Sequence, residues 1–127
     1  FESVIDQYLK NQSFVGGFKY DIFNKGVSLD NVSDFVKVNF YRIIQEAVQN
    51  IIKHSKANHV WINFYLEDEQ LNLTIEDNGI GYEVESDKKG IGLKNIASRV
   101  QKLKGSLKIT AIPNKKTLIH ITVPNNF

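Results

Sequence analysis

Three short segments of the chain combine residue types that can bind or activate a ligand. In the first, Glu46, Asn50 and Lys53 follow one another at intervals of three or four residues. On an α-helix this spacing places them within an arc of about 60° at the margin of the apolar face. An acid and an oxygen ligand one turn apart suit the activation of water or a hydroxyl beside a hard cation such as Mg²⁺. A solvated polar stripe is the alternative, and this segment alone favours it.

The second segment, residues 77–81, reads Asp-Asn-Gly-Ile-Gly. Its two glycines let a ligand approach the backbone, and the carboxylate of Asp77 can accept a hydrogen bond from a donor such as an exocyclic amine. Asp-Asn-Gly is also common in turns, so this segment considered alone favours an ordinary turn.

The third segment, residues 90–93, reads Gly-Ile-Gly-Leu and precedes a predicted helix. Backbone N–H groups at a helix N-terminus form an anion site suited to phosphates, and glycines permit close approach. A generic glycine pair before a helix is the alternative. The chain contains no Walker pattern Gly-x-x-x-x-Gly-Lys-[Ser/Thr]. The Rossmann spacing is also absent, because Asn95 stands where a third glycine is required.

The hydrophobic periodicity predicts the elements that must position these segments. A short helix should begin the chain, with Val4, Ile5, Tyr8 and Leu9 on one face, and end near residues 11–13; a longer one should cover residues 32–54. A third helix should follow from Leu93 and end at Gly105 as a left-handed cap. Strands are expected over residues 18–23, 60–66, 71–75, 107–111 and 119–123, the second and third of them forming a hairpin.

The order of these elements predicts the fold class. Helices and strands do not alternate strictly, which disfavours a doubly wound parallel sheet. Strands with one apolar and one more polar face fit an α+β two-layer sandwich, with about three helices on one face of a mixed, mainly antiparallel sheet. No repeat or linker divides the chain, so we expect a single domain over residues 1–127.

Composition excludes several classes of protein. With 127 residues, 42% hydrophobic and 24% charged, the chain has the composition of a soluble globular domain, not of a disordered or fibrous one. A net charge of +2 does not support binding to nucleic acid. The absence of cysteine excludes disulfides and thiolate metal sites. No apolar run approaches the roughly 18 residues of a membrane span, so we expect a cytoplasmic domain without direct membrane contact.

In order and spacing, the three segments resemble the N, G1 and G2 boxes of the ATPase superfamily of gyrases, heat-shock chaperones, mismatch-repair proteins and histidine kinases. Residues 41–57 are similar to those of the nitrate-sensor and thermosensor type of sensor histidine kinase. The resemblance covers about residues 30 to 124 and implies a Bergerat-type ATP-binding fold. The eight residues between Gly81 and Gly90 would form a short lid, which favours this kinase subclass over the chaperone and gyrase branches.

The resemblance implies a role for each matching position. Asn50 matches the Mg²⁺ ligand, Glu46 the general base or polarising acid, and Asp77 the carboxylate that receives the adenine amine. Glycines that frame the adenine pocket and the lid are matched by Gly79, Gly81, Gly90 and Gly92, the last followed by Leu93. Lys53 and His54 match positions suited to phosphate contact or helix packing.

A further implied contact lies near the end of the chain. Thr117 matches the threonine of a family Gly-Thr pair whose hydroxyl joins a water-linked adenine contact, although Lys116 replaces the glycine here.

The resemblance also implies what such a domain does. It would bind Mg-ATP and supply the γ-phosphate to a histidine on a separate dimerisation domain, for relay to a response regulator. His54, His59 and His120 lack the acidic neighbour typical of that acceptor, and the chain begins without Met, so we expect a fragment of a longer protein that can be anchored in a membrane. His59 and His120 are expected to be structural or surface residues of strands.

Three other interpretations remain open at this point. An anti-sigma-type serine kinase of the same superfamily would need no histidine domain, and the sequence upstream would distinguish it. A degenerate interaction module that no longer binds nucleotide is disfavoured by the intact Glu46, Asn50, Asp77 and four glycines. An unrelated α/β domain would require the combined spacing to be a coincidence.

Overall fold

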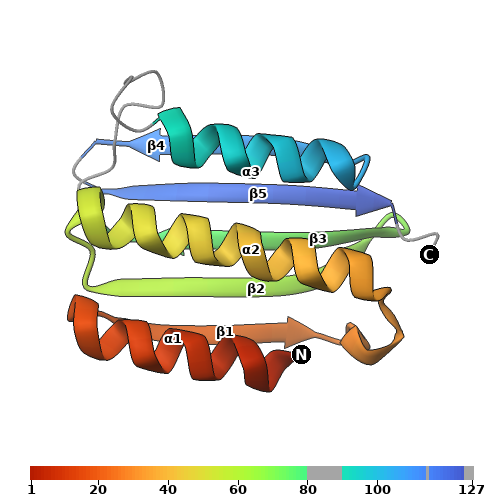
Figure 1. Ribbon diagram of the computed structural model, residues 1–127, viewed down its shortest axis with the longest axis horizontal. Helices are drawn as coiled ribbons and strands as arrows, with labels where there is room; N and C mark the ends of the chain where they lie inside the picture. The colour runs from red at the N-terminus through yellow and green to blue at the C-terminus, as the bar shows by residue number, and fades with distance from the viewer. Residues whose placement is uncertain (80–89, 114, 125–127) are drawn as a thin grey trace.

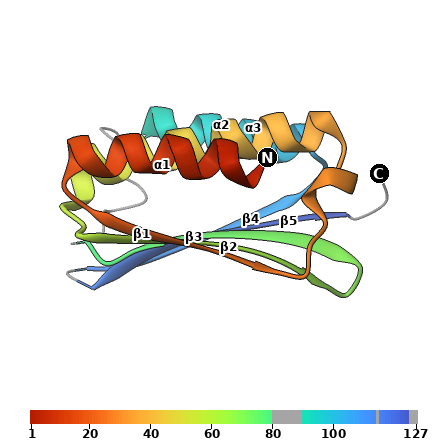
Figure 2. The ribbon, with the colours of Figure 1, turned by 90° about the horizontal axis from the view of Figure 1, so that it is seen from below.

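The computed structural model describes residues 1–79, 90–113 and 115–124. Three α-helices cover one face of a five-stranded sheet, which confirms the predicted two-layer sandwich (Figures 1 and 2). The helical elements are α1 (Glu2–Gly16), a 3₁₀ turn η1 (Leu29–Asn31), α2 (Asp34–Asn50), a π-helical turn η2 (Ile51–Ser55) and α3 (Gly90–Lys102). The strands are β1 (Lys19–Lys25), β2 (His59–Glu67), β3 (Gln70–Asp77), β4 (Ser106–Ile112) and β5 (Lys116–Pro124).

The sheet is mixed and mainly antiparallel, as predicted. Its strand order is β1-β2-β3-β5-β4, with β1 parallel to β2 and every other neighbouring pair antiparallel. Asp68 and Glu69 join β2 to β3, and both have positive φ (54° and 60°), as a two-residue type I′ hairpin requires. The parallel β1–β2 pair is possible because α2 provides the crossover between them.

Alternate strand residues face the helices and form the core. Ile62, Phe64 and Leu73 are fully buried on this face of the sheet, against Phe40 and Ile44 of α2 in the same cluster. The helix begins at Ser33, whose Oγ accepts a hydrogen bond from the N–H of Val36 at 3.3 Å. Burial of this apolar face holds α2 across the centre of the sheet (Figure 1).

The prediction that the first helix ends near residues 11–13 was wrong. Helix α1 continues to Gly16, and Gly17 then adopts the left-handed conformation (φ 72°, ψ 31°) while its N–H donates to the carbonyl of Ser13 at 2.9 Å. The polar residues at 11–13 were taken as a stop signal, but helices tolerate such side chains where they face solvent. The glycine with positive φ is the stronger signal.

The third helix also ends differently from the prediction. The left-handed residue after α3 is Lys104 (φ 56°), whereas Gly105 follows it with its N–H donating to the carbonyl of Val100 at 3.0 Å. Gly105 is required by space, since a Cβ at this position would lie 2.5 Å from the backbone oxygen of Thr122 in β5. The close approach of the two backbones, rather than φ, therefore selects glycine.

The long helix predicted over residues 32–54 contains a change of helical type. Residues 34–50 are α-helical, and residues 51–55 are wound as a π-helical turn before Lys56 takes a left-handed conformation (φ 54°). A π turn is uncommon and is found frequently at functional sites. It changes the angular position of every residue that follows Asn50.

Candidate functional site

Most of the predicted site residues lie at one end of the sandwich. Helix α2 ends there, and α3 and β5 begin there, at the left of Figure 1. Strand β3 ends at the same place, because it is antiparallel to β5 and its last residue, Asp77, pairs with Thr117 near the start of β5. Four elements far apart in the sequence thus meet around one region, with α2 and α3 packed against each other above it.

Asp77 and Thr117 form the centre of this region. They are direct partners in the β3–β5 ladder and lie on the sheet face that the helices cover, with exposed fractions of 2% and 1%. Side chains directly opposite each other in an antiparallel pair are in contact range. The Oγ1 of Thr117 is buried and has no hydrogen-bond partner among the described residues. A buried hydroxyl of this kind calls for a ligand or a water molecule.

The carboxylate of Asp77 is oriented by its own loop. The buried N–H of Gly79 donates to Asp77 Oδ1 at 2.9 Å, closing an Asx-type turn directly after β3. One carboxylate oxygen is therefore held toward the loop. An acceptor with a defined direction suits recognition of a single N–H donor.

Lys116, which replaces the glycine expected before Thr117, does not occupy the same face. Alternation along β5 sends its side chain to the opposite side of the sheet, where Nζ lies 3.8 Å from Glu76 Oε1. The substitution therefore adds no side chain to the sheet face that carries Thr117.

Glu46 and Asn50 lie on successive turns near the end of α2, as predicted. Glu46 is half-buried, and Asn50 is buried with an exposed fraction of 9%. The Nδ2 of Asn50 has no hydrogen-bond partner within the described part of the chain. The described residues contain no group of three or more His, Cys, Asp or Glu side chains that could hold a metal ion. The amide oxygen of Asn50 is a kind of ligand that Mg²⁺ accepts, and a Mg²⁺ site at Asn50 stays a prediction.

The predicted stripe does not extend to Lys53. Lys53 and His54 belong to the π-helical turn η2, so the α-helical angle between Asn50 and Lys53 does not apply. The side chain of Lys53 is exposed and that of His54 is half-buried. Contact of either residue with phosphate stays a prediction.

The glycine-rich segments are described only in part. Helix α3 begins at Gly90, three residues earlier than expected, so Gly90 and Gly92 belong to its first turn. Leu93 is buried in the core against the sheet. Gly81 and the predicted lid at residues 82–89 lie outside the described residues. The N-terminus of a helix of 13 residues at this end of the molecule fits the expectation of an anion site.

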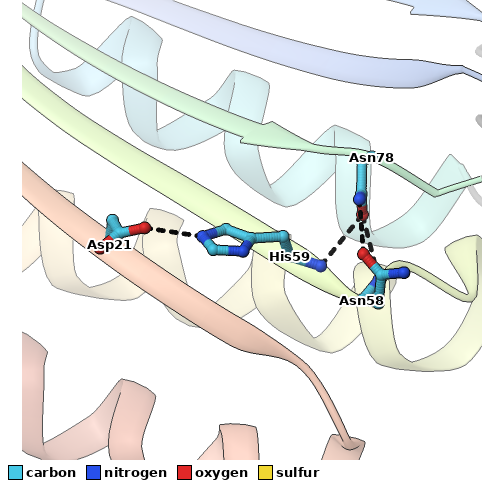
Figure 3. A network of polar contacts seen from close by, with 4 residues as sticks. All are labelled: Asp21, Asn58, His59 and Asn78. Atoms are coloured by element: carbon cyan, nitrogen blue, oxygen red, sulfur yellow. Dashed lines mark hydrogen bonds and ion pairs between the residues drawn. The ribbon is translucent and has the colours of Figure 1, made fainter.

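Sequence reasoning assigned no role to Asn78, yet its side chain makes three hydrogen bonds near the site (Figure 3). Its Oδ1 accepts hydrogen bonds from the backbone N–H groups of Asn58 and His59, both at 3.0 Å, and its Nδ2 donates to Asn58 Oδ1 at 2.5 Å. An asparagine at the end of a strand commonly bonds nearby backbone, and this was the available signal. Its partners, some twenty residues away, are set by the β2–β3 pairing.

The strand histidines have structural partners, as expected. His59 Nε2 lies 2.7 Å from Asp21 Oδ2 in β1, and the ring stacks on Trp61 with centroids 4.3 Å apart. His120 Nε2 lies 2.8 Å from Asn72 Oδ1 and 3.3 Å from the hydroxyl of Tyr65. Both are on the sheet face opposite the helices, away from Asp77 and Thr117.

No helix within the described ranges is both long enough and apolar enough to cross a membrane.

Comparison with protein families gives a match over most of the chain. Residues 35–126 match the family model described as histidine kinase-, DNA gyrase B- and HSP90-like ATPase. Similar proteins include the signal transduction histidine-protein kinase/phosphatase DegS of Brevibacillus brevis, 38% identical over 72% of this chain and 24% of that protein. An uncharacterized sensor-like histidine kinase of Chloroflexus aurantiacus is 35% identical over 94% of this chain and 21% of its own length. The chain thus spans about a quarter or less of the length of these relatives.

Solved structures show the same fold. The histidine kinase domain of the Erythrobacter litoralis EL346 blue-light activated histidine kinase superposes with a TM-score of 0.79 at 19% identity, covering 96% of this chain and 59% of that one. The Acinetobacter baumannii histidine kinase AdeS also gives 0.79 at 19% identity, covering 100% and 66%. At these identities the similarity concerns the arrangement of helices and strands.

Proposed function

Because the chain belongs to the family of histidine kinase-, DNA gyrase B- and HSP90-like ATPases, we propose that it is the domain of a two-component sensor histidine kinase that binds Mg-ATP and delivers the γ-phosphate. The names of the relatives support the kinase assignment within this broad family. The observation that carries the proposal is the buried pair of Asp77 and Thr117 at the end where α2 stops and α3 starts.

In this proposal Asp77 recognises the base. Its carboxylate, held by the N–H of Gly79, accepts a hydrogen bond from the exocyclic amine of adenine. The Oγ1 of Thr117, which lacks a partner within the described residues, completes the contact directly or through one water molecule. Gly79, Gly81, Gly90 and Gly92 carry no side chain and would let the nucleotide approach the backbone.

The other residues act on the phosphates. Asn50 would hold Mg²⁺ through its amide oxygen, and the ion supplies charge neutralisation to the phosphate oxygens. The half-buried Glu46, one turn before Asn50, would accept or polarise the proton of the attacking group. The first turn of α3 offers backbone N–H groups to phosphate, with Leu93 anchoring that turn in the core. Lys53 and His54 would make secondary contacts with the phosphates.

Phosphoryl transfer requires positioning and charge neutralisation rather than covalent chemistry by the protein. The acceptor would be a histidine of a dimerisation domain in the longer protein, and a response regulator would receive the phosphate next. The domain would work in the cytoplasm, where ATP is present.

Thermal unfolding with Mg²⁺ and a non-hydrolysable ATP analogue tests the site. A ligand at 100 times its dissociation constant should stabilise the native state by about 2.7 kcal/mol. We expect this shift for the unaltered chain and its loss in Asp77→Asn. Asp30→Asn is the matched control, since Asp30 is exposed in η1 at the opposite end of the molecule and should keep the shift. A shift that survives Asp77→Asn would disprove the assignment of the base site.

The acceptor is tested with the longer protein and radiolabelled ATP. Phosphate on histidine is released by acid, whereas phosphate on serine or threonine is retained. Acid-labile label that depends on Glu46 and Asn50 is expected. Acid-stable label would contradict the histidine kinase assignment while leaving the ATP site intact.

A further inference from the structure

We propose that Asn78 is a positioning residue that holds the Asp77 carboxylate in the direction required for adenine, and so sets the choice of nucleobase; this rests on the proposed ATP site. Asn78 directly follows Asp77, and its side chain is exposed on the outside of the sheet end. It does not face the helices with Asp77. Its effect on a ligand would therefore be transmitted through the backbone.

The side chain of Asn78 replaces ladder contacts where β3 stops. Its Oδ1 satisfies the N–H groups of Asn58 and His59, and its own N–H donates to the carbonyl of His59 at 3.3 Å. The carbonyl of Asn58 in turn accepts from the N–H of Lys19 at 2.9 Å. Asn78 thus connects the end of β3 to the starts of β2 and β1 (Figure 3).

In the sequence, Asn78 lies between the residue that carries the carboxylate and the residue whose N–H orients it. Asp77 carries the carboxylate, and Gly79 carries the N–H that holds Oδ1 at 2.9 Å. The peptide units on both sides of Asn78 join these groups, so restraining Asn78 restrains their relative position. Without the Asn78 side chain, the end of β3 at Asp77 would lose these hydrogen bonds. Strand ends fray where such bonds are missing.

Loss of the Asn78 hydrogen bonds should affect recognition of the base more than binding of the phosphates. A hydrogen bond to an exocyclic amine depends strongly on direction, whereas contacts with phosphate charge depend mainly on distance. Loss of the Asn78 contacts should therefore weaken binding of an adenine nucleotide selectively. Inosine carries a carbonyl oxygen in place of the adenine amine, so its nucleotides should be insensitive to the change.

Binding constants for non-hydrolysable ATP and ITP analogues, measured with Mg²⁺, test this inference. We expect Asn78→Ala to weaken ATP binding by about tenfold and ITP binding by less than about twofold, in line with the loss of one oriented charged hydrogen bond. Asn78→Asp should restore the ATP preference to within about threefold, because its carboxylate can still accept from both backbone N–H groups. An unchanged ATP-to-ITP ratio in Asn78→Ala would overturn the inference.

Two further variants distinguish a loss of Asp77 positioning from a general loss of stability. Thr122→Val removes a hydrogen bond elsewhere in the sheet and should lower the unfolding temperature without changing the ATP-to-ITP ratio. Asn58→Ala removes only the side-chain contact with Asn78 and should reduce the ratio by about threefold. If Asn78→Ala does not fold, an unchanged ratio in Asn58→Ala refutes the proposal.

Failure of the proposed function has a different signature. If the unaltered chain does not prefer ATP over ITP, or if Asp77→Asn keeps the preference, the base site itself is misassigned. If Asp77→Asn abolishes the preference and Asn78→Ala retains it, the ATP site stands and the role of Asn78 is refuted.

Discussion

Asp77 and Thr117 face each other across β3 and β5, and both are almost fully buried although both are polar. The Asp77 carboxylate has a backbone partner in Gly79, whereas the hydroxyl of Thr117 has none among the described residues. A buried polar group without a partner lowers stability by about 1–3 kcal/mol. In the proposed function, the nucleotide or a water molecule beside it would satisfy this hydroxyl.

This unsatisfied hydroxyl leads to opposite expected effects on stability and on binding. Thr117→Val keeps the shape of the side chain and removes Oγ1, which has no hydrogen-bond partner among the described residues, so the free energy of unfolding without ligand should rise by about 1 kcal/mol. Nucleotide affinity should fall. Chemical denaturation with and without the ATP analogue measures both quantities.

Thr122→Val is the matched control in the same strand. The Oγ1 of Thr122 donates to Asn72 Oδ1 at 3.0 Å on the other face of the sheet. Its removal should lower the free energy of unfolding by about 1 kcal/mol and leave nucleotide affinity unchanged. Equal effects of the two substitutions would contradict the special status of Thr117.

Asn50→Ala should separate magnesium dependence from folding. We expect the variant to lose the additional stabilisation that Mg²⁺ brings to nucleotide binding, and to behave like the unaltered chain when Mg²⁺ is chelated. Its stability without ligand should change little, since the Nδ2 of Asn50 has no partner to lose within the described chain. Thermal unfolding with the ATP analogue, with and without chelator, measures the difference.

Asn39→Ala provides the control on the same helix. Asn39 is also buried in α2, but its Nδ2 donates to the carbonyl of Phe35 at 2.9 Å. This variant should lose stability and keep the response to Mg²⁺. A normal magnesium response in Asn50→Ala would remove Asn50 as the metal ligand.

Substitutions at Gly105 and Lys104 should change the free energy of unfolding in opposite directions. Gly105→Ala places a Cβ 2.5 Å from the carbonyl oxygen of Thr122 and should lower the free energy of unfolding by about 1–3 kcal/mol. Lys104→Gly relieves the left-handed conformation of a residue with a side chain and should raise it by about 1 kcal/mol. Urea denaturation of both variants checks the signs, and a stabilising Gly105→Ala would show that the two backbones separate easily.

Tyr8 gives a prediction about alkaline pH. Burial raises the pKa of Tyr8 above its ordinary value of 10.0, a shift opposed by the hydrogen bond from Gln49 and increased by nearby Tyr41 and Glu46. The folded chain therefore keeps this proton at a pH where the unfolded chain has lost it. The associated stability is complete below pH 10 and is lost as the pH rises through the folded-state pKa.

Tyr8→Phe isolates this contribution. The variant keeps the edge-to-face ring contact with Tyr41, whose centroid lies 5.8 Å away, and removes only the hydroxyl. The free energy of unfolding should decline less steeply above pH 10 in Tyr8→Phe than in the unaltered chain. Parallel declines measured by urea denaturation would refute the shift.

The elements of the fold were largely predictable because their signals are local. Alternation through Ile62 and Phe64 predicts a strand with one buried face, and recurrence of Phe40, Ile43 and Ala47 predicts a helix with an apolar stripe. The spacing of Glu46 and Asn50 likewise belongs to one helix and needs no other part of the chain. These features follow from the period of each structure and from the burial of apolar side chains.

The tertiary structure decided which distant residues meet. The pairing of Asp77 with Thr117 depends on the β3–β5 register, and the close approach of Gly105 to the backbone of Thr122 depends on how the turn after α3 packs against β5. The π-helical turn at Lys53 and the contacts of Asn78 with Asn58 depend equally on packing around the end of α2 and on the β2–β3 pairing. These contacts depend on the free energy of the whole sandwich, to which residues as far as forty positions apart contribute together. A local sequence pattern therefore does not predict them.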